Sequence, residues 1–543
     1  MRRRLLILCV AAPILLAVAA LPGAQASTEA TAGGIFKVSF QGSSSLQAFD
    51  HVDPALAYTR ESWTLLDTVC ARLMRYRDEA PPAGYTVVPE VAAAPPTVSP
   101  DGRTTTFKLR KGFFFSDGSP VRADAFAHAI DRTMAPGIDS PAYLYTQAIV
   151  GADDVKAGKR SRAAGVTARD NTLTVRFTRE VRDFAAWTTM PFFCAVPPTL
   201  PASAEGVRSF PGAGPYTIRE YRPNQRIRIR RNPHYRGNRA HHVDGFDVDL
   251  SATSAQQVLD RIESGKADWG YAPPSPFFER RRDLLRKYGL DQRFQVRAGL
   301  TVWMYVLNSS RALFKDNPEL RRAVNLALDR TEFQLRGAET LADRLVPPLV
   351  PGHRSRRIYP LDGDLRQAKA LANGHLRDGR AVLYAPDSPL KIGIAQALKL
   401  QLDEIGLEVE IRDIPEHVTN TAYRGRLGYP AEPWDLALVL WTPDYVDPYG
   451  YVNRLLDAQS VGGTNLPRFD EQRYLDLIRK AARRQGAARD IAYADLDLQL
   501  GRDAAPVVPM GVLNEATLVS ARVPRACMLL RPGLVLTTVC LKR

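Results

Sequence analysis

The chain has 543 residues, several times the length of an average domain, which excludes a single small module. Hydrophobic residues make up 45% and charged residues 24%, as in ordinary soluble proteins, so a disordered, collagen-like or multi-spanning membrane chain is also excluded. The formal net charge is +15, which alone does not choose between a nucleic acid, an anionic surface and no charged partner.

The first 26 residues have the order of a cleavable secretory signal. Arg2 to Arg4 precede an apolar run from Leu5 to about Leu21, and the small-residue exit Ala24-Gln25-Ala26 follows. We therefore expect a signal peptide over residues 1–26. A membrane anchor is the alternative, but Pro13 interrupts the run, which is also short for a spanning helix. Cys9 lacks the small residues that precede a lipoprotein cysteine, so we expect a periplasmic or extracellular protein without a lipid anchor.

Alternating and helical apolar patterns intermix along the rest of the chain and predict a mixed α and β fold. The clearest helix has Asn317 as N-cap and Pro318 as its first residue. The turns at Asp101-Gly102 and Asp117-Gly118 flank a strand in a hairpin-like pattern. In chain order we expect a strand at 35–40, a helix at 61–74, a strand at 105–109, a helix at 123–134, strands at 173–177, 216–218, 227–229 and 246–250, helices at 258–262, 317–330 and 389–405, and strands at 409–411 and 435–440.

Four cysteines follow the predicted signal: Cys70, Cys194, Cys527 and Cys540. An even number in an oxidising compartment indicates pairing, and four cysteines allow three connectivities. We favour Cys527 with Cys540 because they are close in sequence, which leaves Cys70 with Cys194. Four buried free thiols are the alternative. No Cys-x-x-Cys pair occurs, which argues against structural zinc and thioredoxin-type redox sites.

Motifs for catalysis or phosphate binding are missing from the sequence. The cluster Gly42-Ser43-Ser44-Ser45-Leu46 fails the Gly-x-Ser-x-Gly pattern of a nucleophile elbow. Neither a His-Glu-x-x-His zinc motif nor a phosphate loop occurs, and His241-His242 fits a solvated loop better than a metal site. The basic run from Arg280 to Lys287 fits the exposed face of a helix. We therefore expect that the protein is not an enzyme and that it binds no cofactor, no metal and no nucleic acid.

Four stretches in a fixed order carry a family resemblance. The first runs from Asp101-Gly102 through Phe107-Lys108-Leu109-Arg110 to Phe115-Ser116-Asp117-Gly118-Ser119-Pro120. The second pairs Gly212-Ala213-Gly214-Pro215-Tyr216 with Arg231-Asn232-Pro233-His234-Tyr235. The third begins at Val306-Leu307-Asn308 and ends at Ala327-Leu328-Asp329-Arg330. The fourth runs from Trp434-Asp435-Leu436-Ala437 to Trp441-Thr442-Pro443-Asp444-Tyr445-Val446-Asp447-Pro448.

These stretches resemble those of the family 5 extracellular solute-binding proteins, the dipeptide- and oligopeptide-binding receptors of ABC importers. One departure is Arg122, which stands where the family has a Thr N-cap and cannot accept the helical N–H bonds. The resemblance implies an α/β, periplasmic-binding-protein-like fold (type II, cluster C), with two main lobes, a hinge and an inserted third domain. The implied boundaries are 34–62 with 180–297 and 514–543 for domain I, 63–179 for domain II and 298–513 for domain III. The lobes would bend at crossings near Leu300 and Asn514 and close on ligand.

The resemblance also suggests ligand-binding residues. Asp444 matches the Asp that holds the peptide ammonium in peptide-binding relatives, and Trp441 would form an apolar wall beside it. Tyr445 and Trp303 are further candidates, although each fits a core position equally well. The alternative is that Asp444, Asp447 and Pro448 make an ordinary turn with an Asx hydrogen bond. Gly214-Pro215-Tyr216 and the helix end at Asp329-Arg330 are expected to be structural.

We therefore expect an exported, monomeric receptor that captures short peptides and delivers them to an ABC permease. One alternative keeps the fold and changes the cargo to a nickel chelate, haem, an opine or an oligosaccharide. Two alternatives belong to other classes: a secreted hydrolase, and a polyanion-binding surface protein suggested by the basic charge.

Overall fold

The computed structural model describes residues 30–41, 49–271, 275–334, 340–415, 427, 432–458, 461, 463–531 and 533–542. The predicted signal peptide and the Gly42–Leu46 cluster lie outside the described residues. Within the described ranges, no helix combines the length and the apolar character needed to cross a membrane.

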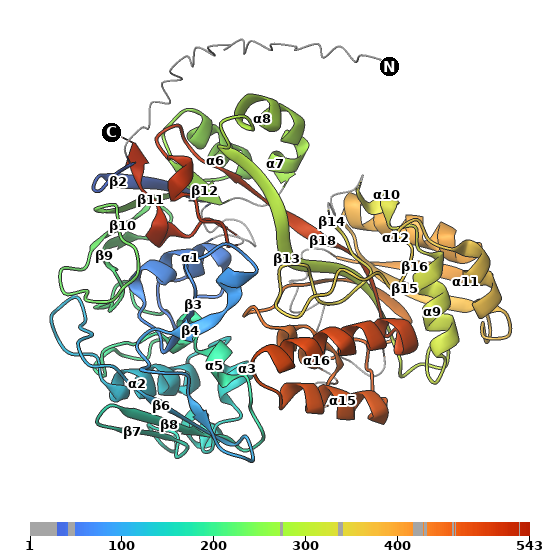
Figure 1. Ribbon diagram of the computed structural model, residues 1–543, viewed down its shortest axis with the longest axis horizontal. Helices are drawn as coiled ribbons and strands as arrows, with labels where there is room; N and C mark the ends of the chain where they lie inside the picture. Colours follow the sequence, from blue (N-terminus) through green and yellow to red (C-terminus); the bar gives the residue numbers. More distant parts are fainter. Residues whose placement is uncertain are drawn as a thin grey trace, which may run out of the picture.

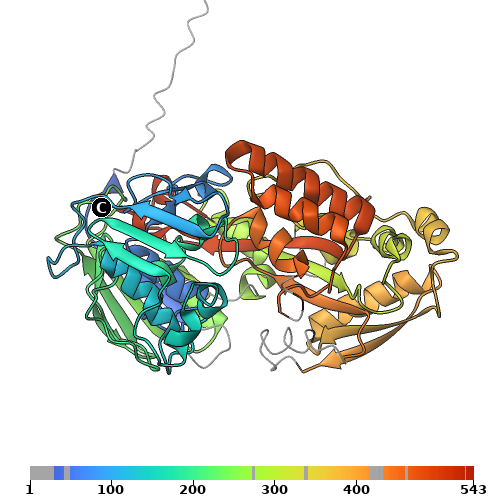
Figure 2. The same cartoon turned by 90° about the horizontal axis from the view of Figure 1, so that it is seen from below.

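The molecule has two lobes, and two long strands run from one to the other (Figure 1). The lobe that contains the N-terminal part of the chain holds a five-stranded and a four-stranded sheet, and the other lobe holds a six-stranded sheet. Seen from below, these lobes lie side by side (Figure 2).

The five-stranded sheet has the order β12-β2-β11-β10-β9, with β2 parallel to both of its neighbours. Its inward side chains alternate, as in Phe36, Val38 and Phe40, and they form one apolar core. The elements here are β2 (Ile35–Gln41), α1 (Arg60–Val69), η2 (Pro191–Phe193), β9 (Tyr216–Arg222), β10 (Arg226–Arg231), β11 (Gly245–Ala252), α6 (Ala255–Glu263), β12 (Trp269–Tyr271), α7 (Ser275–Glu279) and α8 (Arg281–Tyr288).

The four-stranded sheet, of order β5-β6-β8-β7, belongs to a unit inserted between β2 and β9. Helix α2 (Ala123–Met134) contacts this sheet. Arg122 stands at the N-cap of α2 and makes no side-chain capping hydrogen bond, as predicted. The other elements are β3 (Met74–Tyr76), η1 (Ala83–Tyr85), β4 (Val87–Pro89), β5 (Thr97–Val98), β6 (Thr104–Lys108), α3 (Tyr143–Thr146), α4 (Ala152–Lys156), β7 (Val166–Arg169), β8 (Thr172–Arg176) and α5 (Phe184–Trp187).

The six-stranded sheet has the order β14-β18-β13-β17-β15-β16 and forms the second lobe. Its elements are β13 (Phe294–Leu307), α9 (Pro318–Ala327), α10 (Thr331–Gln334), β14 (Thr340–Leu341), α11 (Leu365–Ala372), β15 (Arg380–Pro386), α12 (Pro389–Asp403), β16 (Glu408–Ile414), β17 (Leu436–Trp441), η3 (Pro448–Gly450), α14 (Val452–Leu456), α15 (Gln472–Ala482), α16 (Gly486–Gln499), the π-helical η5 (Leu500–Ala504) and β18 (Val507–Leu518). The chain returns to the first lobe through η6 (Arg525–Cys527) and η7 (Leu536–Thr538), and β19 (Leu541–Lys542) pairs with β1 (Ala30–Thr31).

The two long strands that join the lobes are β13 and β18, which pair antiparallel. The register shifts between Ala298, opposite Asn514, and Val302, opposite Val512, so β13 carries extra residues at this point. The shift lies where a crossing was predicted near Leu300 and Asn514. The domain boundaries themselves stay predictions, although the strands of each sheet fall inside one predicted domain, apart from β13, β18 and β1, which precedes residue 34.

Most local predictions agree with the structure. Asn317 caps α9, since its side chain accepts a hydrogen bond from the Leu320 amide. Helix α1, however, ends at Val69 rather than at Met74, because Cys70 is extended and the chain enters β3. The hairpin-like pattern is only partly right: β5 and β6 pair across the Asp101-Gly102 turn, but the turn at Asp117-Gly118 closes only an isolated bridge.

Both favoured disulfides are present, Cys70–Cys194 and Cys527–Cys540. The second closes a loop of the C-terminal segment with a sequence separation of 13 residues.

The motif around Gly214 is structural, as expected. The Gly214 amide donates to the Val69 carbonyl at 2.9 Å, and a Cβ atom on this glycine would lie 2.6 Å from the Val69 carbonyl carbon. Asn232 from the second half of the motif donates to the Gly214 carbonyl at 3.0 Å. The motif therefore joins β9 to the end of α1 by a close backbone contact that only glycine permits.

Candidate ligand-binding site

Two cavities meet at the segment that follows β17, where the lobes face each other. The first has a volume of about 510 Å³ and the second about 580 Å³. Both are lined by residues of each lobe, and the residues that they share are Tyr58, Thr442, Pro443, Asp444 and Tyr445. The interlobe space required by the sequence interpretation therefore exists, and it is divided in two at Asp444.

Asp444 contacts all three parts of the molecule. It comes from the second lobe, directly after the buried strand β17, and it is partly exposed. Its Oδ1 accepts a hydrogen bond of 2.9 Å from the hydroxyl of Tyr58 in the first lobe. Its Oδ2 accepts one from the hydroxyl of Tyr145, on α3 of the inserted unit. Burial and the neighbouring Asp444 charge raise the pKa of Tyr145, so this hydroxyl stays protonated and remains a donor.

Other contacts hold the lobes together near Asp444. The Val446 amide donates to the Tyr76 hydroxyl at 2.7 Å, and the Arg483 Nη2 lies 3.1 Å from a Glu180 oxygen. Tyr445 donates to Asp183, which also accepts from the Trp187 indole at 2.6 Å. The structure is therefore a closed arrangement, with contacts across the lobe boundary on both sides of the cavities.

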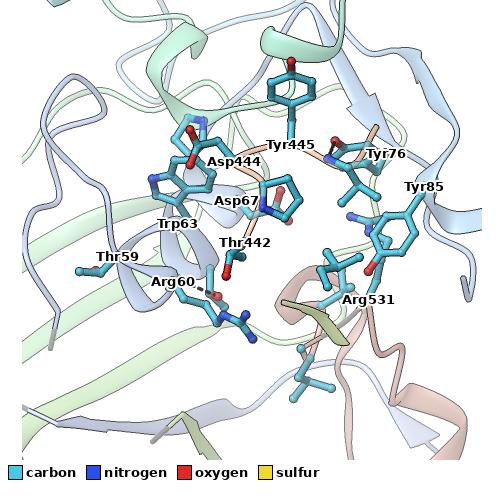
Figure 3. Close-up of a pocket in the computed structure, with 18 of the residues that line it drawn as sticks. Thr59, Arg60, Trp63, Asp67, Tyr76, Tyr85, Thr442, Asp444, Tyr445 and Arg531 are labelled. Atoms are coloured by element: carbon cyan, nitrogen blue, oxygen red, sulfur yellow. Dashed lines mark hydrogen bonds between the residues drawn. The ribbon is translucent and has the colours of Figure 1, made fainter. Parts of the chain in front are cut away.

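The first cavity lies between α1, the residues after β17 and the disulfide-closed loop Cys527–Cys540 (Figure 3). Two of its arginines have carboxylate partners: Arg60 lies 2.5 Å from Glu515, and Arg72 pairs with Asp67. Burial alone would raise the pKa of Asp67, but the charges of Arg239 and Arg72 hold it well below its usual range. These charges are thus compensated within the protein.

The second cavity lies between α3, α14 and the residues after β17. Its main cation is Arg454, whose guanidinium carbon lies 4.5 Å above the centre of the Tyr145 ring and 5.9 Å from that of Trp187. The Arg454 Nε and Nη2 are buried and have no hydrogen-bond partner within the described parts of the chain. Stacking on the two rings stabilises this charge in place of a carboxylate.

Comparison with known proteins agrees with this architecture. The model of the bacterial extracellular solute-binding proteins, family 5 (middle part), matches residues 86–463. The chain belongs to this family. Among relatives of this family 5 protein is the Escherichia coli protein named "Probable D,D-dipeptide-binding periplasmic protein DdpA", 25% identical over 452 residues, which cover 79% of this chain and 80% of that one. The periplasmic oligopeptide-binding protein OppA of the same organism is 25% identical over 455 residues, with 77% and 78% covered.

Among solved structures, "Clavulanic acid biosynthesis oligopeptide binding protein 2" superposes with a TM-score of 0.82 at 23% identity, covering 94% of this chain and 96% of that one. The fold is therefore the type II periplasmic-binding-protein fold, as the resemblance implied. As a family 5 protein, the chain is related to the peptide-binding receptors of ABC importers, which are binding proteins and not enzymes.

The structure brings three of the four predicted ligand-binding residues to the cavities of this family 5 protein. Asp444 and Tyr445 line both, and Trp441 lines the second. Trp441 is 5% exposed and its indole donates to the Gly450 carbonyl at 2.9 Å, so only a small part of the ring is available to a ligand. The hydroxyl of Tyr445 is already used by Asp183. Ligand contact by these residues stays a prediction.

Trp303 lies elsewhere. It stands on β13 next to Val302, which pairs with Trp441, so the side chains of the two tryptophans point to opposite faces of the six-stranded sheet. Trp303 packs in the core cluster of Tyr305 and Leu307, while Trp441 packs with Val302. Trp303 lines neither cavity.

The turn expected as the alternative is present, and Asp447 makes its Asx hydrogen bond. Its carboxylate accepts from the Tyr449 amide at 2.8 Å and from Arg489 at 2.7 and 2.9 Å. Asp329 and Arg330 are structural too, since Arg330 is fully buried and donates to the Pro509 carbonyl at 2.9 Å.

Several site residues were not predicted. Tyr58 and Tyr145 lie in segments without a motif, and they reach Asp444 from sequence separations of 386 and 299 residues. The loop that carries Arg531 could be anticipated only through the Cys527–Cys540 pairing. No group of three or more His, Cys, Asp or Glu side chains is arranged to hold a metal ion within the described ranges.

Proposed function

We propose that this family 5 protein is an exported receptor that captures short peptides between its lobes and delivers them to an ABC permease. The observation that carries the proposal is the position of Asp444. It is a partly exposed carboxylate at the junction of two interlobe cavities, held by two neutral donors rather than by a cation. A carboxylate offers about four acceptor positions, so it can take a peptide ammonium in addition to the tyrosine hydroxyls.

Electrostatics favour an ammonium there. A unit charge pair at about 4 Å and an effective dielectric of about 20 attracts by about 4 kcal/mol before desolvation. The names of the relatives, a D,D-dipeptide-binding protein and an oligopeptide-binding protein, support a peptide as cargo. Export is supported by the signal-like pattern of residues 1–26. Closure on ligand is supported by β13 and β18, which run between the lobes and carry register shifts.

The test is isothermal titration calorimetry of the purified protein with pooled di- to hexapeptides. Asp444→Asn keeps the shape of the side chain and removes its charge, and we expect a loss of affinity of about hundredfold. Asp476→Asn, on the exposed side of α15 in the same lobe, is the matched control and should bind like the parent.

Equal binding by parent and Asp444→Asn would refute the ammonium anchor. Binding of a nickel chelate, haem, an opine or an oligosaccharide instead of any peptide would support the alternative cargo. Labelling by a serine-reactive probe would contradict a non-enzymatic role.

A further inference from the structure

The outer side of the first lobe carries a row of arginines that the proposed function does not use. The arginine row consists of Arg222 on β9 and of Arg226, Arg228 and Arg230 on β10. It belongs to segment 219–231, which contains six arginines and one glutamate. Figure 1 shows the hairpin of β9 and β10 on the side of the first lobe that faces away from the second lobe. The arginine row lines neither interlobe cavity, so the candidate site does not explain its charge.

Strand geometry places these side chains on one face of the five-stranded sheet. The isoleucines of β10 belong to the apolar core, and side chains alternate along a strand, so the arginines of β10 point to the opposite face. Helix α6 packs against β12, β2 and β11. The side chains of Arg222, Arg226 and Arg228 are 57%, 40% and 45% exposed, so the face of β9 and β10 is open to solvent.

A single carboxylate serves three members of the arginine row. Glu220 lies at N–O distances of 2.5, 2.9 and 3.3 Å from Arg222, Arg226 and Arg228. The hydrogen bond from Arg226 and the neighbouring guanidinium charges lower the pKa of Glu220, so its carboxyl group stays ionised. Three guanidinium groups around one carboxylate leave a surplus of two positive charges.

The neighbouring strand β11 does not remove this surplus. Its Asp247 lies 2.8 Å from Arg230, the fourth member of the arginine row. Its Asp249 stands opposite Arg226 in the ladder, but it pairs with Arg261 of α6 at 3.0 Å. The carboxylates of β11 are thus engaged at other positions than the end of the hairpin.

The end of the hairpin also brings two like charges together. Arg222 and Arg226 stand directly opposite each other in the ladder of β9 and β10. Like charges at directly opposite positions destabilise an antiparallel pair, and an external anion would relieve this repulsion. The surplus charge and the repulsion therefore coincide on one exposed face.

We propose that the arginine row docks the protein on an anionic lipid bilayer, with its guanidinium groups on the lipid phosphates. A guanidinium presents paired N–H donors that match two oxygens of a phosphate. The charge is spread over an open sheet face and does not converge in a cavity, which favours an extended anionic surface over a single small ion.

This inference goes beyond the proposed function and does not depend on the cargo. An ABC permease lies in a membrane, so docking on lipid would keep the receptor close to the place of delivery. Peptide binding between the lobes and lipid binding by the arginine row use separate surfaces, and each can be measured without the other.

Sedimentation with sucrose-loaded vesicles tests the proposal, with the exported protein that lacks the predicted signal peptide. The vesicles contain either phosphatidylcholine alone or a mixture with about 30% phosphatidylglycerol. At about 0.05 M salt we expect the parent to bind the anionic vesicles about tenfold or more tighter than the neutral ones, and at about 0.5 M salt this preference should disappear through screening.

A double variant locates the binding. Arg222→Gln with Arg228→Gln removes two charges of the arginine row, and we expect the affinity for anionic vesicles to fall by about 25-fold, or about fivefold for each arginine. Arg479→Gln with Arg502→Gln is the matched control, because it removes the same charge from exposed positions of the second lobe. The control should bind within about twofold of the parent.

Two measurements exclude a folding defect. Arg222→Gln alone removes the like-charge pair, so thermal stability should not fall although vesicle binding does. Arg222→Lys with Arg228→Lys keeps both charges and should retain most of the binding that the Gln variant loses.

Three results would overturn the proposal. The first is equal binding of the parent to neutral and anionic vesicles. The second is an equal loss in the two double Gln variants, which would assign the effect to net charge. The third is retention on heparin without binding to anionic vesicles, which would identify a soluble polyanion as the partner. Peptide affinity is expected to be the same in all of these variants, so failure here leaves peptide capture through Asp444 untouched.

Discussion

The two cavities beside Asp444 are similar in size but differ in how the protein treats their cations. In the second, the Arg454 guanidinium is stacked on Tyr145 and Trp187. In the first, Arg60 and Arg72 pair with Glu515 and Asp67, and Arg531 lies 3.9 Å from Asp78 with its guanidinium carbon 5.6 Å from the centre of the Tyr76 ring. Volume alone would rank the cavities as equals, whereas their cations distinguish them. The arginines of the first have carboxylates nearby, and the Arg454 Nε and Nη2 of the second are buried without a hydrogen-bond partner among the described residues.

The walls of the cavities explain this difference. The second cavity is lined by Tyr145 and Tyr445, and the Tyr145 ring contacts both Tyr445 and Trp187 edge to face. The first is bounded by α1 and the disulfide-closed loop; it too has aromatic walls, such as Tyr76 and Tyr85, but carboxylates lie beside its arginines. The Arg454 guanidinium of the second cavity is therefore stabilised by rings, and the guanidinium groups of the first mainly by carboxylates.

The largest expected effect comes from filling each cavity in turn. Thr64 lines only the first and Thr464 only the second, and both are partly exposed. We expect Thr64→Trp to weaken peptide binding by about hundredfold through steric exclusion, and Thr464→Trp to leave it within about twofold. Calorimetry with the best peptide measures both, and the reverse result would assign the ligand to the second cavity.

The next effect concerns the wall of the first cavity. Replacing Cys527 and Cys540 by Ser opens a loop with a separation of 13 residues. The chain-entropy model predicts a loss of about 3 kcal/mol in the free energy of unfolding. Because the loop lines the first cavity, we also expect peptide affinity to fall. Denaturant unfolding and calorimetry check the two parts, and an unchanged peptide affinity would show that the loop does not shape the binding site.

A smaller effect comes from Glu61, buried on α1 beside Arg60. The residue is 2% exposed, and burial raises its pKa to about 7. The folded state then binds more protons than the unfolded state, in which Glu titrates near about 4.3, so stability falls as the pH rises between these values. From about pH 5 to about pH 7.5 we expect Glu61 to lower the free energy of unfolding by about 2 kcal/mol.

Denaturant unfolding at the two pH values measures this loss. In Glu61→Gln the same pH change should cost about 2 kcal/mol less than in the parent. Asp101→Asn, at an exposed turn of the inserted unit, is the matched control. Identical pH profiles for the parent and Glu61→Gln would contradict the assignment.

The smallest effect is expected from the hydroxyl that separates the cavities. Tyr58→Phe removes one of the two donors that orient Asp444. The carboxylate keeps its charge and its bond from Tyr145, so we expect peptide affinity to fall by only about threefold. Tyr143→Phe, which removes a hydroxyl bonded to Asp153 outside both cavities, is the control. An unchanged affinity for Tyr58→Phe would show that Tyr145 alone orients the anchor.

Much of the fold could be predicted because local signals agreed with tertiary contacts. Asn317-Pro318 starts α9 as expected, and the apolar run before Trp441 is the buried strand β17. Prediction failed where a tertiary contact overrides the local pattern. The helical spacing of apolar residues continues past Val69. The helix nevertheless stops there, because Cys70 is extended and the Gly214 amide donates to the Val69 carbonyl.

The site was predictable only in part. A motif placed Asp444 between the lobes, but the same motif could not show whether Trp441 is exposed. Trp303 looked like a site residue because it is aromatic. Side chains alternate along β13, however, and that of Trp303 lies on the opposite face of the sheet from that of Trp441. The partners of Asp444 come from distant segments, and no local pattern reports contacts that depend on how the lobes meet.

The register shift in the strands that join the lobes has a mechanical consequence. Between Ala298 and Val302, β13 has residues that are not matched one to one with β18. A change of angle between the lobes at this point would break few ladder hydrogen bonds, whereas bending on either side would break several. The two strands can thus bend at the unmatched residues while their paired segments stay stiff. Within these strands, amide hydrogen exchange should be fastest in the unmatched stretch.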